Sequence, residues 1–149
     1  MDKTTAGPQR LRTLPSWLIT QTAQHAHRLV SERLAEIGGR GHHYRLLAAL
    51  DESGPASQAT LGRRSAIHLS DLVAAINELA EHDLVSRTPD PDDRRRNIIT
   101  ITPAGRRQLK KLGRQIDRIQ DDLLAPLSTA EREQLTTLLE RVLRHHQGA

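Results

Sequence analysis

Residues 84–105 read LVSRTPDPDDRRRNIITITPAG, and this stretch decides the fold that the rest of the chain has to fit. The segments 84–87 and 97–101 are short and rich in β-branched residues, which favour strands. The polar segment 89–96 lies between them, so the pattern predicts a β-hairpin with an exposed, charged tip. Thr102 and Pro103 then supply an N-cap and a first-turn proline, which predicts that a helix follows directly.

Before the hairpin, apolar residues recur at helical spacing. They predict helices at about 14–37, 44–52, 58–64 and, beginning near 68–70, to about 82. Ser57 is placed to cap the third of these helices. In the fourth helix we expect a buried stripe of Leu69, Leu72, Val73, Ile76 and Leu79. The positions expected nearer to solvent are Ser70, Asp71, Ala74, Asn77 and Glu78.

After the hairpin, a long helix is predicted from Thr102 to about Leu124. Its apolar residues alternate steps of three and four, the repeat of a coiled-coil seam: Leu109, Leu112, Ile116, Ile119 and Leu123. Such a seam can join two chains or pack within one chain as in a helical bundle. Pro126 ends the helix, and Ser128 with Glu131 predicts a capping box for a last helix.

Composition limits the class of protein. The chain has 149 residues, 36% of them hydrophobic but only 1% aromatic, which predicts one domain with an aliphatic, helical core. It contains no Cys, so disulfides, thiolate metal sites and a cysteine nucleophile are excluded. The sequence lacks a run long enough to span a membrane and a signal peptide at 1–12, so we expect a cytoplasmic protein without membrane contact.

A short helix, a tight turn, a second helix and a charged hairpin are suited to reading duplex DNA. The second helix fits the major groove, while a basic hairpin reaches the neighbouring backbone or minor groove. The reading helix at 69–82 carries Asp71, Glu78 and Glu81, so it cannot supply the affinity for phosphates. We therefore assign that affinity to Arg63 and Arg64 and to the arginines at 94–96.

The hairpin also resembles the wing of MarR-family regulators. Asp93 and Arg95 match the Asp-x-Arg of the family's wing tip, and Thr102 and Gly105 match the Thr-x-x-Gly that enters the next helix. Ala66 and Asp83 stand where many relatives have glycine. The order of elements agrees over nearly the whole chain. We therefore expect a mainly α (α+β) fold: a winged helix-turn-helix with long N- and C-terminal dimerisation helices and a two-stranded β-wing.

The resemblance implies a homodimeric, sequence-specific transcriptional regulator that binds a palindromic operator in double-stranded DNA, acts as a repressor and is released by a small-molecule effector. Within the single chain 1–149 it assigns 10–40 to a dimerisation and effector helix, 42–102 to DNA binding and 103–149 to dimerisation. It places Arg95 in the minor groove and has Asp93 hold the wing by pairing with a nearby arginine, with Arg87 as the candidate.

Three groups of site residues follow from these interpretations. The expected DNA contacts are Ser57, Gln58, Arg63, Arg64, His68, Ser70, Asp71, Ala74, Asn77, Arg87, Arg94, Arg95 and Arg96. The expected dimer contacts are Leu14, Leu18, Leu109, Leu112, Ile116, Ile119, Leu123, Leu135, Leu138 and Val142. About half of the following are expected to line the effector cavity: Trp17, His25, His42, His43, Tyr44 and Arg45. The alternative for Trp17 and Tyr44 is that they complete an aliphatic core.

The sequence gives little indication of a metal site or of an enzyme. The eight histidines invite comparison with metal sites, but we expect them to be solvated or capping residues and predict no metal and no cofactor. The sequence contains no hydrolase elbow, phosphate loop or metalloprotease motif, so we predict no enzyme. The alternative function is an architectural, nucleoid-type DNA-binding protein without ligand control.

Overall fold

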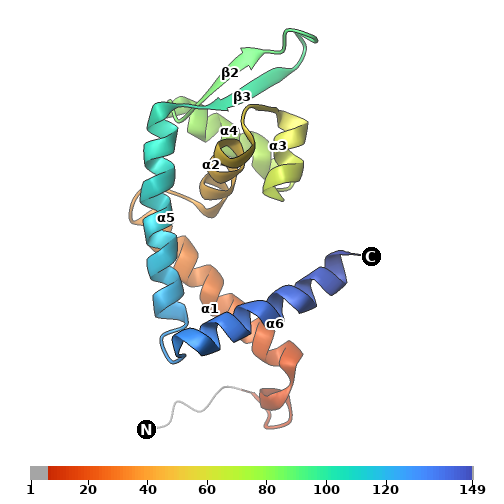
Figure 1. The fold of residues 1–149 in the computed structure, drawn as a ribbon, viewed down its shortest axis with the longest axis vertical. Coiled ribbons are helices and arrows are strands. Elements are labelled where there is room, and N and C mark those ends of the chain that lie inside the picture. The colour runs from red at the N-terminus through yellow and green to blue at the C-terminus, as the bar shows by residue number, and fades with distance from the viewer. Residues whose placement is uncertain (1–6, 149) are drawn as a thin grey trace.

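The hairpin predicted from residues 84–105 is present at one end of the molecule (Figure 1). The computed structural model describes residues 7–148. Strands β2 (Val85–Pro89) and β3 (Asn97–Ile101) pair antiparallel, with Val85 opposite Ile101. A third strand, β1 (Ala56–Ser57), pairs with the other edge of β3. The predicted two-stranded wing is thus confirmed. Strand β1 was not predicted, because a strand of two residues is too short to show an alternating pattern.

The six predicted helices are all present, with ends that shift by a few residues. The elements are the 3-10 turn η1 (Leu11–Thr13) and the helices α1 (Pro15–Ala35), α2 (Gly41–Ser53), α3 (Gln58–Ser65), α4 (Leu69–Glu81), α5 (Pro103–Leu123) and α6 (Thr129–Gln147). The predicted caps are confirmed, since Ser57 accepts from Thr60 N at 3.3 Å and Thr102 from Gly105 N at 3.0 Å. Ser128 and Glu131 form the capping box.

Both positions where relatives carry glycine have a left-handed backbone. Ala66 has φ 55° in the turn between α3 and α4, and Asp83 has φ 56° in the turn before β2. At a third position glycine itself is required, because a Cβ on Gly105 would lie 2.1 Å from Leu84 O. The first turn of α5 therefore packs directly on the base of the hairpin, where Thr102 Oγ1 also donates to Asp83 O at 2.7 Å.

One aliphatic core joins the sheet to the helices. Its largest fully buried side chains are all Leu or Ile, as the composition predicted. Leu46 and Leu50 of α2 lie at its centre, and Leu34 of α1 and Leu112 of α5 extend it away from the sheet. The α2–α4 region and the hairpin are thus fixed to the long helices by continuous packing.

Much of the apolar seam of α5 is covered within the protomer. Leu112 is 0% exposed and Ile119 is 1% exposed, while Leu109 and Ile116 are partly buried against the same cluster. For Leu112 and Ile119 the assignment to a dimer interface was wrong, because these side chains pack within one chain. For Leu109, Ile116 and Leu123, which are only partly buried, it stays a prediction. The physical reason is that α5 packs against α1 and α2, which covers the seam.

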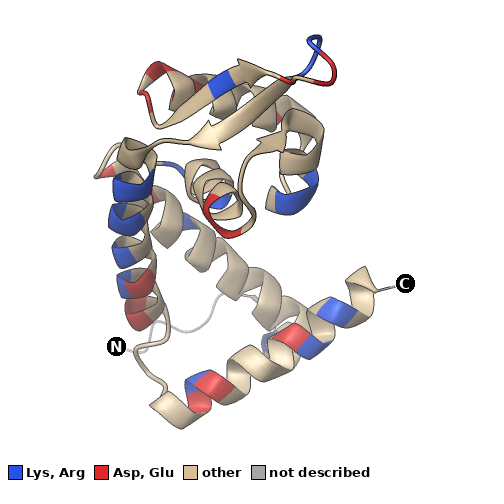
Figure 2. Cartoon of the chain, turned by 45° about the horizontal axis from the view of Figure 1, so that its top comes forward, with Lys and Arg blue, Asp and Glu red and all other residues tan. Residues whose placement is uncertain are grey.

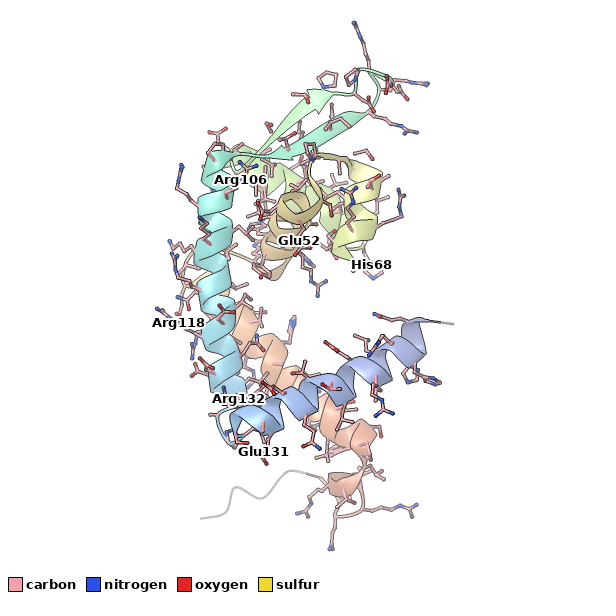
Figure 3. The ribbon with its side chains drawn as sticks, in the orientation of Figure 1. Glu52, His68, Arg106, Arg118, Glu131 and Arg132 are labelled. Carbon is pink, nitrogen blue, oxygen red and sulfur yellow. The ribbon has the colours of Figure 1, made fainter. Side chains whose placement is uncertain are left out.

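Helix α6 turns away from α5 at a corner held by Arg132. Figure 3 labels Arg132 at this corner. Its guanidinium donates to Leu124 O at 3.2 Å and to Asp121 Oδ1 at 2.9 Å. No residue of α6, from 129 to 147, is buried. Among residues 7–148, the exposed large hydrophobics outside α4 lie at α1 and on α6: Leu14, Leu18, Ile19, Leu138, Leu139, Val142 and Leu143. No described helix is both long and apolar enough to cross a membrane.

Candidate nucleic-acid interface

Helix α4 lies beside α3 and below the hairpin, at the end of the molecule opposite α6 (Figure 1). A cleft of about 520 Å³ separates α3 from the hairpin. Five of the predicted DNA contacts line it together: Ser57, Gln58, Arg63, Arg95 and Arg96. The structure thus brings the cations of α3 and of the hairpin tip to one side of the molecule.

The hairpin tip is organised by the carboxylate of Asp93. It accepts from the backbone N of Arg95 at 3.1 Å and from Arg95 Nε at 3.2 Å, and its second oxygen lies 3.6 Å from Arg96 Nε. The side chain of Arg95 is 93% exposed. Asp93 therefore shapes the tip and leaves the arginines in solvent.

The expected pairing of Asp93 with Arg87 was wrong. Arg87 stands opposite Ile99 in the ladder, away from the tip, and donates to Asn77 Oδ1 on α4. The strand register explains the difference, because it places Arg87 next to the reading helix. Arg87 therefore ties the hairpin to α4.

The buried stripe of α4 differs from the prediction. Leu72, Ile76 and Leu79 are buried as expected, but Leu69 is 67% exposed and Val73 is 40% exposed. At about 100° per residue, Val73 lies on the side of Leu72 opposite to Ala75, so it falls outside the buried stripe. The core stripe is instead completed by Ala75, at 5% exposure. Counting alanine as apolar would have shifted the predicted stripe to its observed place.

The acidic flank of α4 faces the beginning of α2. Glu78 accepts from Arg40 NH1 at 3.1 Å and from His43 Nε2 at 2.8 Å. Asp71 and Ala74, which were expected to contact DNA, line a pocket of about 90 Å³ on this same flank. Up to Asn77, the face of α4 toward the hairpin consists of Leu69, Ser70, Val73 and Asn77, which carry no charge. Glu81, one turn further on, lies beside Asn77 and Arg87.

Positive charge surrounds this uncharged face. Figure 2 shows Lys and Arg at the hairpin tip and at the end of α3, with a further row along α5. Arg64 and Arg94 are exposed, as is His68 at the N-cap of α4. Helix α4 itself contains no Lys or Arg in residues 69–81. Cations thus lie beside the reading helix and not on it.

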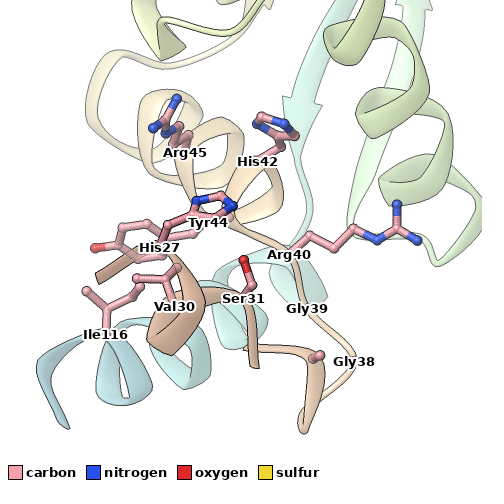
Figure 4. Close-up of a pocket in the computed structure, with 12 residues that line it drawn as sticks. His27, Val30, Ser31, Gly38, Gly39, Arg40, His42, Tyr44, Arg45 and Ile116 are labelled. Atoms are coloured by element: carbon pink, nitrogen blue, oxygen red, sulfur yellow. The ribbon is translucent and has the colours of Figure 1, made fainter. Parts of the chain in front are cut away.

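A second site, away from α4, is a cavity of about 710 Å³ between α1, α2 and α5 (Figure 4). Three of the six predicted effector residues line it: His42, Tyr44 and Arg45. The other three lie elsewhere. Trp17 packs beside Gly7, His25 is exposed on α1, and His43 is turned to Glu78.

Sequence reasoning missed several residues of this cavity. His27, Val30 and Ser31 contribute from α1, Arg40 from the loop before α2, and Ile116 from α5. The spacing of His27, Val30 and Ser31 places them on one helical face, and this was the available signal.

The cavity is cationic and connects to the α3–α4 pair. Arg40 lines it and bonds Glu78 of α4, while Arg45 lines it and donates to Ala66 O in the α3–α4 turn at 3.4 Å. His42 Nδ1 is buried in the structure and has no hydrogen-bond partner among the described residues. No Asp or Glu of the described chain lines the cavity. These features suit a ligand with an anionic group.

Across residues 7–148, no three His, Asp or Glu side chains gather into a set that can hold a metal ion.

The sequence is similar to known regulators. Residues 37–96 match the model of the MarR family. The chain is 34% identical over 101 residues to a putative transcriptional regulatory protein for the hcr operon of Thauera aromatica, an alignment that covers 68% of this chain and 61% of that protein. The chain thus spans less than two thirds of that relative. It is 33% identical over 99 residues to YxaD of Bacillus subtilis, an uncharacterized HTH-type transcriptional regulator, covering 66% of this chain and 69% of that protein.

The fold is similar to solved structures along most of the chain. A probable transcriptional regulator from Pseudomonas aeruginosa has a TM-score of 0.78 and 32% identity, covering 89% of this chain and 99% of that one. The PcaV transcriptional regulator from Streptomyces coelicolor, in complex with its natural ligand, has a TM-score of 0.76 and 28% identity, covering 93% and 97%.

Proposed function

Because the chain belongs to the MarR family of transcriptional regulators, we propose that it binds a palindromic operator in double-stranded DNA as a homodimer and represses transcription until a small molecule releases it. Residues 42–102 form the DNA-binding part in this proposal. Residues 10–40 and 103–149 form the dimerisation part.

One observation carries the DNA-binding proposal. Leu69, at the start of the uncharged face of α4, shares one cleft with Arg63 of α3 and with Arg95 and Arg96 of the hairpin. A helix enters the major groove, and cations on either side neutralise the phosphates that border it. Arg95, which extends into solvent from the hairpin tip, is the residue that we assign to the minor groove.

The homodimer is supported by the apolar surface at the other end of the molecule. The exposed side chains of α1 and α6 fit a second copy, since a symmetric dimer buries the same patch twice. The predicted dimer contacts that are not buried in the protomer stay in the proposed interface: Leu14, Leu18, Leu109, Ile116, Leu123, Leu135, Leu138 and Val142. In this arrangement the α4 helix of each protomer faces outward, so that the two helices can contact the two half-sites of one duplex.

Release by an effector is supported by the cationic cavity. Its volume of about 710 Å³ is that of a small-molecule site. An anionic ligand there attracts Arg40, which bonds Glu78 of α4, and Arg45, which bonds Ala66 O in the α3–α4 turn. Binding thus favours the state in which these two contacts are broken, and the two-state equilibrium shifts away from the DNA-binding arrangement.

The main experiment is sequencing of genomic DNA that co-purifies with the protein, followed by titration at fixed salt. The sequences should contain an inverted repeat, bound at least ~10³-fold more tightly than random duplex. The Arg95→Ala variant should lose about 1–3 kcal/mol of operator affinity, while Arg95→Lys keeps the charge and retains the phosphate part. A specificity ratio near one would instead identify an architectural protein.

The coupling between the cavity and α4 is tested by Glu78→Gln. We expect operator affinity without ligand to fall about two- to fivefold, which corresponds to ~0.5–1 kcal/mol for a partly exposed ion pair. Glu133→Gln, which removes the same charge at an exposed position of α6 away from the DNA-binding end, is the control and should bind as the wild type does. Equal affinities for both variants would remove Glu78 from the coupling.

A further inference from the structure

The structure exposes two large apolar side chains on the reading helix, Leu69 at 67% and Val73 at 40%. We propose that these are specificity-determining residues that contact thymine methyl groups, so that each half-site holds A·T pairs beneath the first turns of α4. The proposal rests on the DNA-binding function proposed above and names the bases that it reads.

Dimerisation does not account for these two residues. The other exposed large hydrophobics of residues 7–148 gather at α1 and α6, at the opposite end of the molecule (Figure 1). Leu69 and Val73 stand apart from that surface, among the residues expected to contact DNA. A separate occupant therefore has to cover them.

The surroundings indicate what that occupant is. Leu69 and Val73 are four residues apart and so lie on one helical face, one turn from each other. Leu69 shares its cleft with Arg63, Arg95 and Arg96. The occupant is thus anionic at its edges and offers apolar groups at the centre. The major groove of a thymine-containing duplex has this character, since phosphates border it and C5-methyl groups project into it.

The polar groups of α4 agree with this assignment. Bidentate recognition of guanine uses Arg or Lys, and residues 69–81 contain neither. Asn77 Oδ1 accepts from Arg87, so the amide presents its NH₂ group as a donor. A donor suits the O4 acceptor of thymine, whereas bidentate recognition of adenine also requires the amide oxygen.

The test begins with selection of duplexes from a random pool by the full-length protein at fixed salt. Enriched half-sites should contain thymine at two positions facing α4. Each such thymine is then replaced by deoxyuridine, which removes the methyl group and keeps every hydrogen-bonding group. Affinity should fall about fourfold at each position, the factor that corresponds to burial of one methyl-sized group. Thymines outside the half-sites serve as the control and should tolerate the replacement.

Two variants assign the methyl groups to side chains. Leu69→Ala should lose the response to deoxyuridine at one position, and Val73→Ala should lose it at the other. Both side chains are exposed, so helix content should remain that of the wild type, as checked by circular dichroism.

The outcomes separate this inference from the proposed function. An enriched site without thymine at these positions, or full tolerance of deoxyuridine, overturns the inference and leaves sequence-specific binding intact. A pool without enrichment overturns both. A lower oligomeric mass of Leu69→Ala in light scattering would show that a second copy covers this face of α4, which also overturns the inference.

Discussion

Helices α5 and α6 follow each other in the chain and carry similar apolar patterns, yet the structure uses them in opposite ways. The apolar face of α5 is covered within the protomer, where Leu112 is 0% exposed. The apolar face of α6 is exposed, with Leu138 at 47% and Val142 at 49%. The period of a hydrophobic pattern thus identifies the apolar face of a helix but not the partner that covers it. That partner is set by the preceding chain, since α1 and α2 pack on α5 and leave α6 uncovered.

The N-caps of α5 and α6 also differ in whether they contact the rest of the protein. The cap of α5 is tied to the body of the protein, because the hydroxyl of Thr102 also donates to Asp83 O. The cap of α6 is local, formed by Ser128 and Glu131 with each other. We therefore expect substitutions in α5 to change the stability of the protomer, and substitutions in α6 to change association or local helix formation.

Among substitutions that test this difference between α5 and α6, Leu112→Ala is expected to have the largest effect, a loss of protomer stability. Removal of a fully buried leucine leaves a cavity and should lower the free energy of unfolding by about 2–5 kcal/mol. Urea denaturation measures the change. The matched control is Leu69→Ala, which shortens a 67% exposed leucine and should change stability little. A small effect of Leu112→Ala would mean that α5 does not depend on the core for its position.

A second, smaller effect is expected from Leu138→Glu in α6. A charge in the proposed dimer interface should raise the dissociation constant of the dimer about 30-fold, or ~2 kcal/mol. Light scattering over a concentration series measures this, while circular dichroism should show retained helices because α6 is open in the protomer. Thr137→Glu adds the same charge on the opposite face of α6, at an exposed position, and should remain dimeric. A dimeric Leu138→Glu would exclude this face from the interface.

The sequence was sufficient to predict the six helices and the hairpin, but not which segments pack against one another. Caps such as Ser57, Thr102 and Ser128 act within one turn, so the sequence predicted them and the structure confirms them. Strand β1 and the partners of α5 depend on contacts between distant segments, which periodicity does not encode. The left-handed positions 66 and 83 were predictable only through resemblance, because Ala66 gives no local signal for such a backbone.

In the candidate site, too, the sequence predicted the features that depend on local structure and missed those that depend on contacts between segments. Arginines at the hairpin tip project from a turn, and exposure there follows from local structure. Arg87 and Asp93 were paired wrongly because their separation depends on strand register. Leu69 and Val73 were assigned to the core because hydrophobicity was read as burial, although a binding face can also be apolar.

The smallest effect is expected at the capping box of α6, where Glu131→Gln should change a pH dependence. The backbone N–H of Ser128, and secondarily its hydroxyl, hold the pKa of Glu131 below its ordinary value. A carboxyl with a lowered pKa in the folded state stabilises that state at pH above its unfolded pKa of about 4.3. This contribution is lost as the pH falls through the folded pKa. Amide hydrogen exchange in the first turn of α6 should therefore be slower in the wild type than in Glu131→Gln at neutral pH, and the two should converge in acid. The first turn of α5, capped by a neutral threonine, should show no such difference between the two proteins. A difference at α6 that persists in acid would mean that the carboxylate charge does not act through the cap.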